Sequence, residues 1–588
     1  MRRDVVCSAS AWNFAQMEDV WRHFKPQTPY GRDRVAEKTV YVEPDVLASL
    51  YDDVEAFGDF VERLGPDRSR LDKISWHLGR IPRLPVLWGE ATTDGQRQSV
   101  SGPKDKTYES AVDIFLYKKF LANYSKLCDL VDAKTRDHFA LEFKSGDILS
   151  LLSLGGSDAE TFYISEKYDS RLLEIRNSIA EIGRKIEAKR TRAAETVKET
   201  LGIDFSGRDF VTVPRATGLE LLKRDDLNSK WHLYIEVNDE YSFIARLVPD
   251  SEMLMLESER SKLYETERII EDAVIADLSE RLKAESALVE AYVGIVSRFD
   301  LAKSRFELGK KYNLRRPAFV AGDRGRGQEE RGIRMVVRQG IFIPLCAECG
   351  KMGTKYTPLD IALNRNAAVI FGSNMGGKTV VLKSLLFFQL MAQTGLGVPA
   401  ASYVTTLFSA IDYVGDRPDT AAKGLSSFGF EVRALSDIVE KAASRTCLVA
   451  FDEFAQTTSS REAEALLSSV VSFFSRAQKP CLALFATHFQ GLARDTAALY
   501  FRMAGLDVAA ARRYFGELAD SAGAYSLAER IKNINTIMRY YVVPEDAEKG
   551  AADADGSDAL EVASLLGLDE KILAAARAYR CGAGRGNR

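Results

Sequence analysis

Val369-Ile-Phe-Gly372-Ser-Asn-Met-Gly-Gly377-Lys378-Thr379 is an apolar segment followed by a glycine-rich loop that ends in Lys-Thr. The pattern G-x-x-x-x-G-K-T predicts a phosphate-binding loop, because glycines let successive backbone N–H groups curl around a phosphate without Cβ clashes. Lys378 is placed to reach the β- and γ-phosphates of a nucleotide. The Thr379 hydroxyl is placed to hold Mg²⁺ at the start of a helix.

The residues on either side of this loop are predicted to form regular elements. Ala368 to Phe371 form a strand, and Val380 to Thr394 place apolar residues at helical spacing until Gly395 ends the helix. A strand, a glycine loop and a helix in this order are typical of an α/β P-loop domain. A chance glycine turn would lack this context.

Two further apolar segments end in residues suited to hydrolysis. Thr446 to Glu453 is a predicted strand that ends in Asp452 and Glu453, and Cys481 to Ala486 is another, followed by Thr487 and His488. Asp452 is expected to hold Mg²⁺, Glu453 to orient or deprotonate the attacking water, and His488 to sense the γ-phosphate or position that water. Taken alone, the acidic pair is equally consistent with a buried strand reaching the surface, and His488 with a hydrogen-bonded histidine at a strand end.

Five segments in this order closely resemble the ATPase domain of the MutS family. They are Gly372-Ser-Asn-Met-Gly-Gly-Lys-Thr379, Gly395-Leu-Gly-Val-Pro-Ala400, Leu425-Ser-Ser-Phe-Gly-Phe-Glu431, Asp452-Glu453 and Phe485-Ala-Thr-His488. The Asn-Met inside the loop and the Val-Pro-Ala after the helix are not general features of phosphate loops. The resemblance covers roughly residues 335 to 545 well and the flanking regions more weakly.

The resemblance implies an ABC-type composite ATP site in a homodimer. Ser426 and Ser427 of one subunit would close on the γ-phosphate bound to the other. Mg²⁺ would be held by Thr379 and Asp452, and catalysis would rest on Glu453, His488 and Lys378. The residues expected to bind the nucleotide are Gly372, Asn374, Met375, Gly376, Gly377, Lys378, Thr379, Val380, Ser426 and Ser427.

Composition limits the possible domain organisation, ligands and location of the protein. The 588 residues suffice for several domains, and 80 basic against 84 acidic residues leave a net charge of −4, with no global basic footprint for nucleic acid. The seven cysteines are scattered, and the one C-x-x-C pair, Cys346 and Cys349, favours a turn over a zinc site because no second pair follows. No secretion signal or membrane span is evident, so we expect a cytoplasmic protein.

The resemblance divides the chain into four expected parts. They are a helical core, connector- and lever-like, over residues 1–158; antiparallel coiled-coil arms over 159–320 with a small clamp-like β tip at about 205–250; the ATPase domain over 335–542; and an acidic linker, closing helices and a disordered tail over 543–588. The ATPase domain is expected to be helical from His488 to about residue 542. Tyr356 is a candidate to stack on adenine or, equally, a core tyrosine.

Thr28-Pro-Tyr-Gly-Arg32 resembles the start of the family's helical core, and Phe299-Asp-Leu-Ala302 is similar to the return into it. A core that begins near residue 28 leaves no room for the amino-terminal domain that reads mismatches, and no Phe-x-Glu wedge precedes it. We therefore expect a member without that domain and without a Smr nuclease domain.

The arms are predicted from two long stripes of apolar residues. Leu172, Ile175, Ile179, Ile182 and Ile186 form an a/d seam in a helix from about 160 to 200, and a second helix is expected from about 252 to 312. The strand patterns between them predict a small sheet, with Trp231 and Tyr234 in its core. In the family this region grips DNA, yet residues 201–250 carry six basic and nine acidic side chains.

Two active functions stay open. The first is a DNA-associated MutS-family ATPase, related to mismatch repair or recombination but lacking a mismatch reader. The second is a protein-remodelling ATPase, because the Thr457-Thr458 pair and the ending Ala563-Ser-Leu-Leu-Gly-Leu-Asp569 look like MutS-related ATPases proposed to reactivate cobalamin-dependent aminomutases. A coiled-coil protein with a decayed site is disfavoured, since every catalytic side chain is present. Ala455 to Ser459 departs from the family's usual Gly-Arg-Gly-Thr-Ser, and Ser373 replaces its proline.

Overall fold

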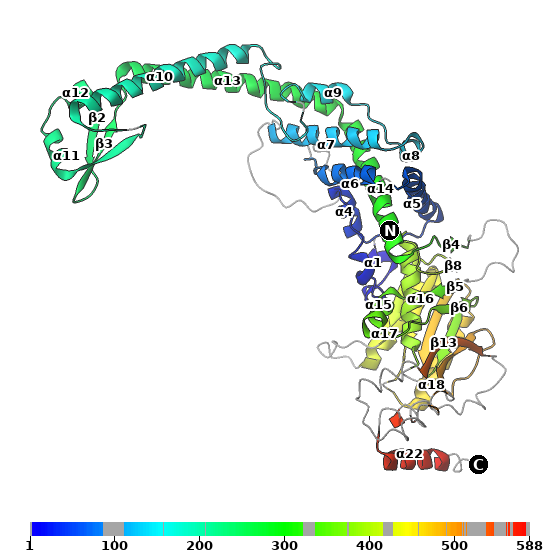
Figure 1. The fold of residues 1–588 in the computed structure, drawn as a ribbon. Helices are drawn as coiled ribbons and strands as arrows, with labels where there is room; N and C mark the ends of the chain where they lie inside the picture. The colour runs from blue at the N-terminus through cyan, green and yellow to red at the C-terminus, as the bar shows by residue number, and fades with distance from the viewer. Residues whose placement is uncertain are drawn as a thin grey trace. The chain divides into compact units, whose positions relative to one another are not determined.

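The structure is a computed structural model in which the chain divides into two compact units (Figure 1). Unit 1 consists of Met1–Asp72, Asp132–Ala140 and Ile295–Arg588, and unit 2 of Lys73–Val131 and Leu141–Gly294. The residues described are 3–66, 68–85, 111–156, 158–205, 207–320, 335–372, 376–415, 427–456, 458–489, 491–507, 510, 513, 537–545, 560, 563–564 and 568–583.

The centre of unit 1 is a six-stranded sheet in the order β13-β12-β7-β11-β10-β9. Five neighbouring strands run parallel and only β13 is antiparallel to its neighbour. Parallel strands covered on both faces favour continuous apolar runs, and β7, β10 and β11 have them. The strands are β7 (Ala367–Phe371), β9 (Ala410–Val414), β10 (Cys447–Asp452), β11 (Cys481–Thr487), β12 (Leu499–Leu506) and β13 (Met538–Glu545).

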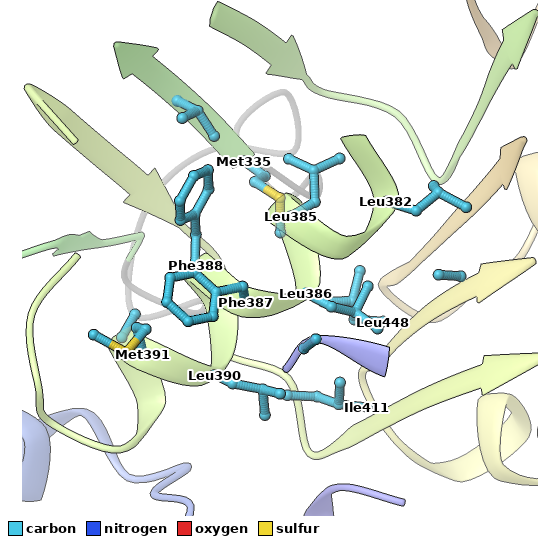
Figure 2. Close-up of a cluster of buried hydrophobic side chains, with 14 of the residues drawn as sticks. Met335, Leu382, Leu385, Leu386, Phe387, Phe388, Leu390, Met391, Ile411 and Leu448 are labelled. Carbon is cyan, nitrogen blue, oxygen red and sulfur yellow. The ribbon is translucent and has the colours of Figure 1, made fainter. Parts of the chain in front are cut away.

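Alternate residues of these strands enter two separate cores. Ala368 and Ile370 of β7 join the core formed with α16 (Lys378–Gln393), whereas Ala367 and Val369 join the core formed with α17 (Ser427–Ser444) and α18 (Ser460–Ser475). Helices therefore cover both faces of the sheet. Figure 2 shows the α16 side, where Leu386 and Leu390 lie beside Leu448 and Ile411 of the strands.

A second, four-stranded sheet in the order β4-β8-β5-β6 packs on the other side of α16. Its strands are β4 (Ala318–Phe319), β5 (Met335–Gly340), β6 (Leu359–Leu363) and β8 (Ser402–Thr405), with α15 (Ile343–Met352) between β5 and β6. Gly340 permits the contact with α16, because a Cβ there would lie 2.7 Å from the Phe388 ring. Figure 2 shows Phe388 and Met335 side by side in this core.

The amino end of the chain packs against the outer strand β9. The short helices α1 (Arg3–Val6) and α2 (Ala9–Phe14) contact this strand. Cys7 forms a parallel bridge with Ile411, and the Ser8 N–H donates to the Ile411 carbonyl at 3.0 Å. The Phe14 and Tyr413 rings stack with centroids 3.8 Å apart. The first residues of the chain thus close one edge of the central sheet.

Several helices of unit 1 meet around two buried aspartates. Asp300 accepts hydrogen bonds from the backbone N–H groups of Gln27 and Thr28, and Asp53 accepts from Arg298 and pairs with His138. The helices concerned are α4 (Pro29–Ala36), α5 (Pro44–Leu64), α8 (Ala133–Phe139) and the later part of α14 (Ser286–Tyr312). The short helix α3 (Glu18–Trp21) instead contributes Val20 and Trp21 to the core that contains α16.

Unit 2 contains two long helices, α10 (Arg171–Leu201) and α13 (Ser251–Ala284), packed side by side (Figure 1). Arg176 bonds Glu267 and Glu271, whereas Lys189 bonds Glu252, so residue numbers rise along α10 as they fall along α13 and the helices are antiparallel. The expected helix boundaries were wrong in two places. The first helix begins at Arg171 rather than near 160, and the second is interrupted at Glu285, between α13 and α14.

Unit 2 also contains shorter helices. Among them are the later part of α6 (Ser69–Arg80), α7 (Ala111–Leu130) and α9 (Gly146–Leu152). Tyr292 stacks on Tyr124 of α7 with ring centroids 4.3 Å apart, and its hydroxyl accepts a hydrogen bond from the Lys144 N–H. These contacts fix the start of α14 among the helices of this unit.

Between α10 and α13 lies a three-stranded antiparallel sheet in the order β1-β3-β2. Its strands are β1 (Phe210–Pro214), β2 (Leu233–Val237) and β3 (Ser242–Leu247), accompanied by α11 (Arg215–Leu222) and α12 (Leu227–Trp231). Phe243 and Ile235 are buried against the helices, and Trp231 packs on this core. Tyr234 was expected in the same core, but it lies on the opposite face, half-exposed beside Arg246.

The end of the chain differs from the expected run of helices. Leu499–Leu506 and Met538–Glu545 form β12 and β13 of the central sheet. A last helix, α22, covers Glu570–Ala583. Its residues 580–583 fall in the segment, 580–588, that was expected to be a disordered tail. Among the described helices, none is both long and apolar enough to cross a lipid bilayer.

Candidate functional site

The predicted site residues follow the carboxyl ends of three neighbouring parallel strands. The order β7-β11-β10 and the registers Phe371 with Thr487 and Asp452 with Ala486 place these ends at one edge of the sheet. Ligands of open α/β sheets bind at this edge. Gly372, Glu453 and His488 are each the residue immediately after one of the three strands.

The described part of the glycine loop turns back on itself. The Lys378 ammonium donates to the Gly372 carbonyl at 2.7 Å, joining the two ends of the loop. Gly377 has φ +89°, a left-handed conformation that favours glycine, and it is the residue before the first turn of α16. Asn374 and Met375 lie outside the described residues, and Gly376 follows them at the loop's end.

Thr379 and Asp452 come together across the edge. The Thr379 hydroxyl donates to Asp452 Oδ1 at 3.1 Å. Burial raises the pKa of Asp452, against the effect of this hydrogen bond, and the neighbouring negative charge of Glu453 raises it further. The site therefore holds two close carboxylates at a position where positive charge would be favourable.

Lys378 supplies part of that positive charge. Its side chain is fully buried, and its ammonium lies 4.0 Å from Glu453 Oε1. Burial lowers the pKa of Lys378, while attraction to Glu453 and Asp452 opposes that effect. The acids at the strand end thus partly offset the effect of burial on the Lys378 ammonium.

The Thr379 and Asp452 side chains fit a magnesium ion by their chemistry. A hydroxyl and one carboxylate are hard oxygen donors, and Mg²⁺ is usually bound by one or two carboxylates together with phosphates and water. No cluster of three or more His, Cys, Asp or Glu side chains capable of holding a metal occurs in the described parts of the chain. This arrangement suits a metal that arrives with a phosphate ligand.

Glu453 and His488 are connected through a residue that the sequence did not single out. The Gln456 amide donates to Glu453 Oε2 and lies 3.2 Å from His488 Nδ1. An amide N–H can only donate, so Nδ1 accepts in this contact. The signal available in the sequence was the three-residue spacing from Glu453, within a segment noted only for departing from the family's usual residues.

The turn after β10 orients this group. Glu453 and Ala455 have φ +54° and +65°, which is unusual for residues with a Cβ. The Glu453 N–H donates to the Ala486 carbonyl at 3.0 Å, and the Ala455 N–H donates to Glu431 Oε2 at 2.7 Å. Glu431 of α17 therefore helps to hold the turn that carries Glu453.

A cavity of about 330 Å³ adjoins the glycine loop. Gly377, Thr379 and Val380 form one wall, and α15 contributes to another. Tyr356 and Tyr540 also line it. The Tyr356 hydroxyl accepts a hydrogen bond from the Phe342 N–H at 2.8 Å, and burial raises the pKa of Tyr356 to about 12. Tyr356 is thus fixed by its hydroxyl, with its side chain in the cavity wall.

The structure brings most of the predicted residues to one place. Those near the strand ends are Gly372, Gly376, Gly377, Lys378, Thr379, Val380, Asp452, Glu453 and His488. Ser427 is the first residue of α17, and Ser426 lies outside the described residues. The predicted contact of Ser426 and Ser427 with a nucleotide on another subunit stays a prediction.

The segment from Gly372 to His488 lies within a region that matches a known protein family. Residues 368–581 match the family model for MutS domain V. Over 327 residues the chain is 28% identical to the DNA mismatch repair protein MutS of Thermus aquaticus, and over 348 residues 27% identical to the DNA mismatch repair protein Msh3 of Dictyostelium discoideum. A longer match, 22% identical over 489 residues, covers 80% of the chain and half of the Staphylococcus saprophyticus DNA mismatch repair protein MutS.

The helices and the sheets define a mixed α/β protein that contains a MutS domain V. The chain belongs to the MutS family. It spans 34% of the Thermus protein and 23% of the Dictyostelium protein, so it corresponds to half or less of the length of these relatives.

Proposed function

We propose that this protein is an ABC-type P-loop ATPase that hydrolyses ATP in a composite site between two subunits and thereby moves the α10 and α13 arms. The observation that carries the proposal is the contact of Thr379 with Asp452 beside Lys378 and the 330 Å³ cavity. These groups are suited to a charged phosphate chain next to an apolar base. Family membership adds support, since MutS proteins are ATPases.

The chemistry follows from the charges of the site. The Lys378 ammonium would leave the Gly372 carbonyl for the β- and γ-phosphates, and Tyr356 and Tyr540 would enclose the base. Mg²⁺ held by Thr379 and Asp452 would offset the negative charge of the phosphates. A water oriented by Glu453 attacks the γ-phosphorus, its proton passes to the carboxylate and ADP leaves. Gln456 would hold the Glu453 and His488 side chains in their positions relative to each other. Ser426 and Ser427 of the second subunit would complete the site.

DNA is the partner that the relatives favour. All three named above are DNA mismatch repair proteins. The antiparallel α10 and α13 with the β1-β3-β2 sheet would act as coiled-coil arms and a clamp-like tip. ATP binding would change the position of these arms around the nucleic acid.

A protein client is the second candidate, favoured by the charges of the tip. Arg224 pairs with Asp226 at 3.2 Å and Arg246 with Glu236 at 3.0 Å. Two of its six basic side chains are thus engaged by acids of the tip itself, where acids are in excess. Neutralised arginines contribute little to binding a phosphate backbone. The arms would then hold a protein that the ATPase remodels.

The test is ATP binding and steady-state hydrolysis by the wild type, Lys378→Ala and Glu453→Ala. Glu453→Ala should bind ATP but hydrolyse it slowly, whereas Lys378→Ala should lose binding. Equal hydrolysis by all three would refute the site. Homoduplex, mismatched and branched DNA are then added at low and physiological salt. Stimulation that survives physiological salt supports DNA as the partner; no response, or one lost with salt, favours the protein client.

A further inference from the structure

Cys346 and Cys349 lie one turn apart in α15, where the sequence predicted a turn of the chain. At this helical spacing the Cβ atoms of two residues are about 5–6 Å apart on the same side of the helix. Both residues are partly exposed, whereas Cys7, Cys128, Cys447 and Cys481 are buried. Among the cysteines that the structure describes, this pair is therefore the one open to small reagents.

Cys349 belongs to the wall of the nucleotide-sized cavity. Together with Leu345 and Met352 it forms the part of α15 that lines this space, which Gly377 and Thr379 also line. A charge on Cys349 is close enough to raise the pKa of both Tyr356 and Tyr540. The thiol therefore lies among the groups proposed to enclose the base.

Cys346 is not among the residues that line the cavity, although a charge on its thiol would also raise the pKa of Tyr356. Burial raises the pKa of the Cys346 thiol, and the adjacent Cys349 raises it further, which indicates that the two thiols are close. The described residues offer no third side chain that would make the pair a metal site. Two neighbouring thiols without a metal are suited to thiol–disulfide exchange.

We propose that Cys346 and Cys349 form a dithiol modification site that low-molecular-weight disulfides oxidise, and that closing the Cys346–Cys349 disulfide weakens nucleotide binding in the adjoining cavity. This inference rests on the proposed nucleotide site. The Cys349 thiolate attacks one sulfur of the reagent and releases one thiol. The Cys346 thiolate then attacks Cys349 Sγ in the mixed disulfide and releases the second thiol. Two electrons and two protons pass from the cysteines to the reagent.

The effect on the cavity follows from the geometry of the helix. A disulfide needs Cβ atoms about 3.5–4.5 Å apart, so the turn between the two cysteines must tighten by about 1–2 Å. Cys349 and the part of the cavity wall that it forms move with this turn, because both cysteines belong to α15. A shift of this size is enough to lose close contacts with a bound base. The site would make ATP binding sensitive to oxidising conditions.

The experiment starts with the fully reduced protein, whose affinity for Mg-ATP is measured by calorimetry. The protein is then incubated with glutathione disulfide, and the peptide that contains both cysteines is examined by mass spectrometry. We expect this peptide to lose two hydrogen atoms and the Kd for Mg-ATP to rise at least about tenfold, equivalent to about 1.4 kcal/mol. Dithiothreitol should restore the original affinity.

Cys346→Ser is the matched variant, because residue 346 does not line the cavity. In the reduced state it should bind Mg-ATP as the wild type does. With glutathione disulfide it should stop at a mixed disulfide that carries glutathione on Cys349, which would show that Cys346 closes the ring. Prior saturation with Mg-ATP should slow the reaction of Cys349 in both proteins.

Two results would overturn the proposal while the proposed function stands. In the first, the reduced protein binds Mg-ATP but the peptide never loses two hydrogens. In the second, the disulfide closes and the Kd changes by less than about twofold. If the reduced protein fails to bind Mg-ATP at all, the proposed function fails first and the inference falls with it, whatever the mass of the peptide.

Discussion

The Thr28 hydroxyl donates a hydrogen bond to the Asp300 carboxylate at 2.7 Å, joining residues 272 positions apart in the sequence. The backbone N–H groups of Gln27 and Thr28 donate to the same carboxylate, and the Thr28 oxygen also caps α4 by accepting from the Gly31 N–H. Burial raises the pKa of Asp300, against these hydrogen bonds. The two segments that resemble the start of the family's helical core and the return into it thus meet at one carboxylate.

Replacing Thr28 should test how much this junction stabilises unit 1. Thr28→Val keeps the shape but removes one buried hydrogen bond to a charge and the helix cap, so the free energy of unfolding should fall by about 2 kcal/mol. Thr28→Ser keeps the hydroxyl and should cost less than about 1 kcal/mol. Urea denaturation followed by tryptophan fluorescence measures both. Equal losses in the two variants would show that the hydroxyl contributes little.

The Thr379 and Asp452 pair predicts a strict metal requirement. Chelation of Mg²⁺ should abolish ATP hydrolysis, and Asp452→Asn should lower kcat at least about 100-fold at saturating Mg²⁺. The structural cost of this change should be small, because an amide oxygen can still accept from the Thr379 hydroxyl. Hydrolysis is measured by phosphate release over a magnesium titration. Thr379→Ser is the control and should retain activity, since it keeps the hydroxyl.

Gln456 is predicted to act as a positioning residue. Gln456→Ala removes the bridge between Glu453 and His488, so kcat should fall by about tenfold while the Kd for ATP changes less than about twofold. Thr458→Ala is the matched control two residues away. Within the described part of the chain, the Thr458 hydroxyl donates only to Glu462, which is exposed. A loss of ATP affinity in Gln456→Ala would instead assign Gln456 to binding.

Asp132 predicts a pH-dependent contribution to stability. Burial would raise its pKa, but the Arg63 guanidinium and the Thr135 N–H and hydroxyl lower the pKa of Asp132 to about 2. Because the folded pKa lies below the ordinary value of 3.8, the stabilisation is complete at neutral pH. It is lost as pH falls from about 4 toward 2.

The test compares Asp132→Asn with Asp132→Ala. Asparagine still caps α8 but carries no charge, so the stability difference from the wild type should shrink as the pH is lowered from about 5 to 3. Alanine also loses the cap to the Thr135 N–H, which adds about 1 kcal/mol at every pH. Chemical denaturation at stepped pH gives both differences. A constant gap between wild type and Asp132→Asn would contradict the lowered pKa.

The sequence predicted the parts of the site that depend on local pattern. The apolar runs of β7, β10 and β11 are continuous because both faces are covered, and each ends in a residue whose chemistry is recognisable: Gly372, Glu453 or His488. The shared edge of the sheet follows from parallel pairing alone. Spacing within the chain was therefore enough to predict that these three residues follow neighbouring strands; their roles stay predictions.

Other parts depend on contacts that no local pattern reveals. β12 and β13 were expected to be helical, yet each gains its partner only across the sheet, and a long segment separates them in the chain. Gln456 acquires its role only where the strands carrying Glu453 and His488 lie together. Cys346 and Cys349 were assigned to a turn, since a C-x-x-C pair carries no helical signal of its own.

The pairing of Ser8 with Ile411 also bears on how the protein is made. β9 is the outer strand of the central sheet, and such a strand presents backbone groups that can pair with a second molecule. Synthesis proceeds from the amino end, so the segment that covers this edge leaves the ribosome some four hundred residues before the strand does. The amino-terminal segment is thus already available to pair with β9 when the sheet forms. A fragment that begins after residue 14 would expose the edge and should self-associate.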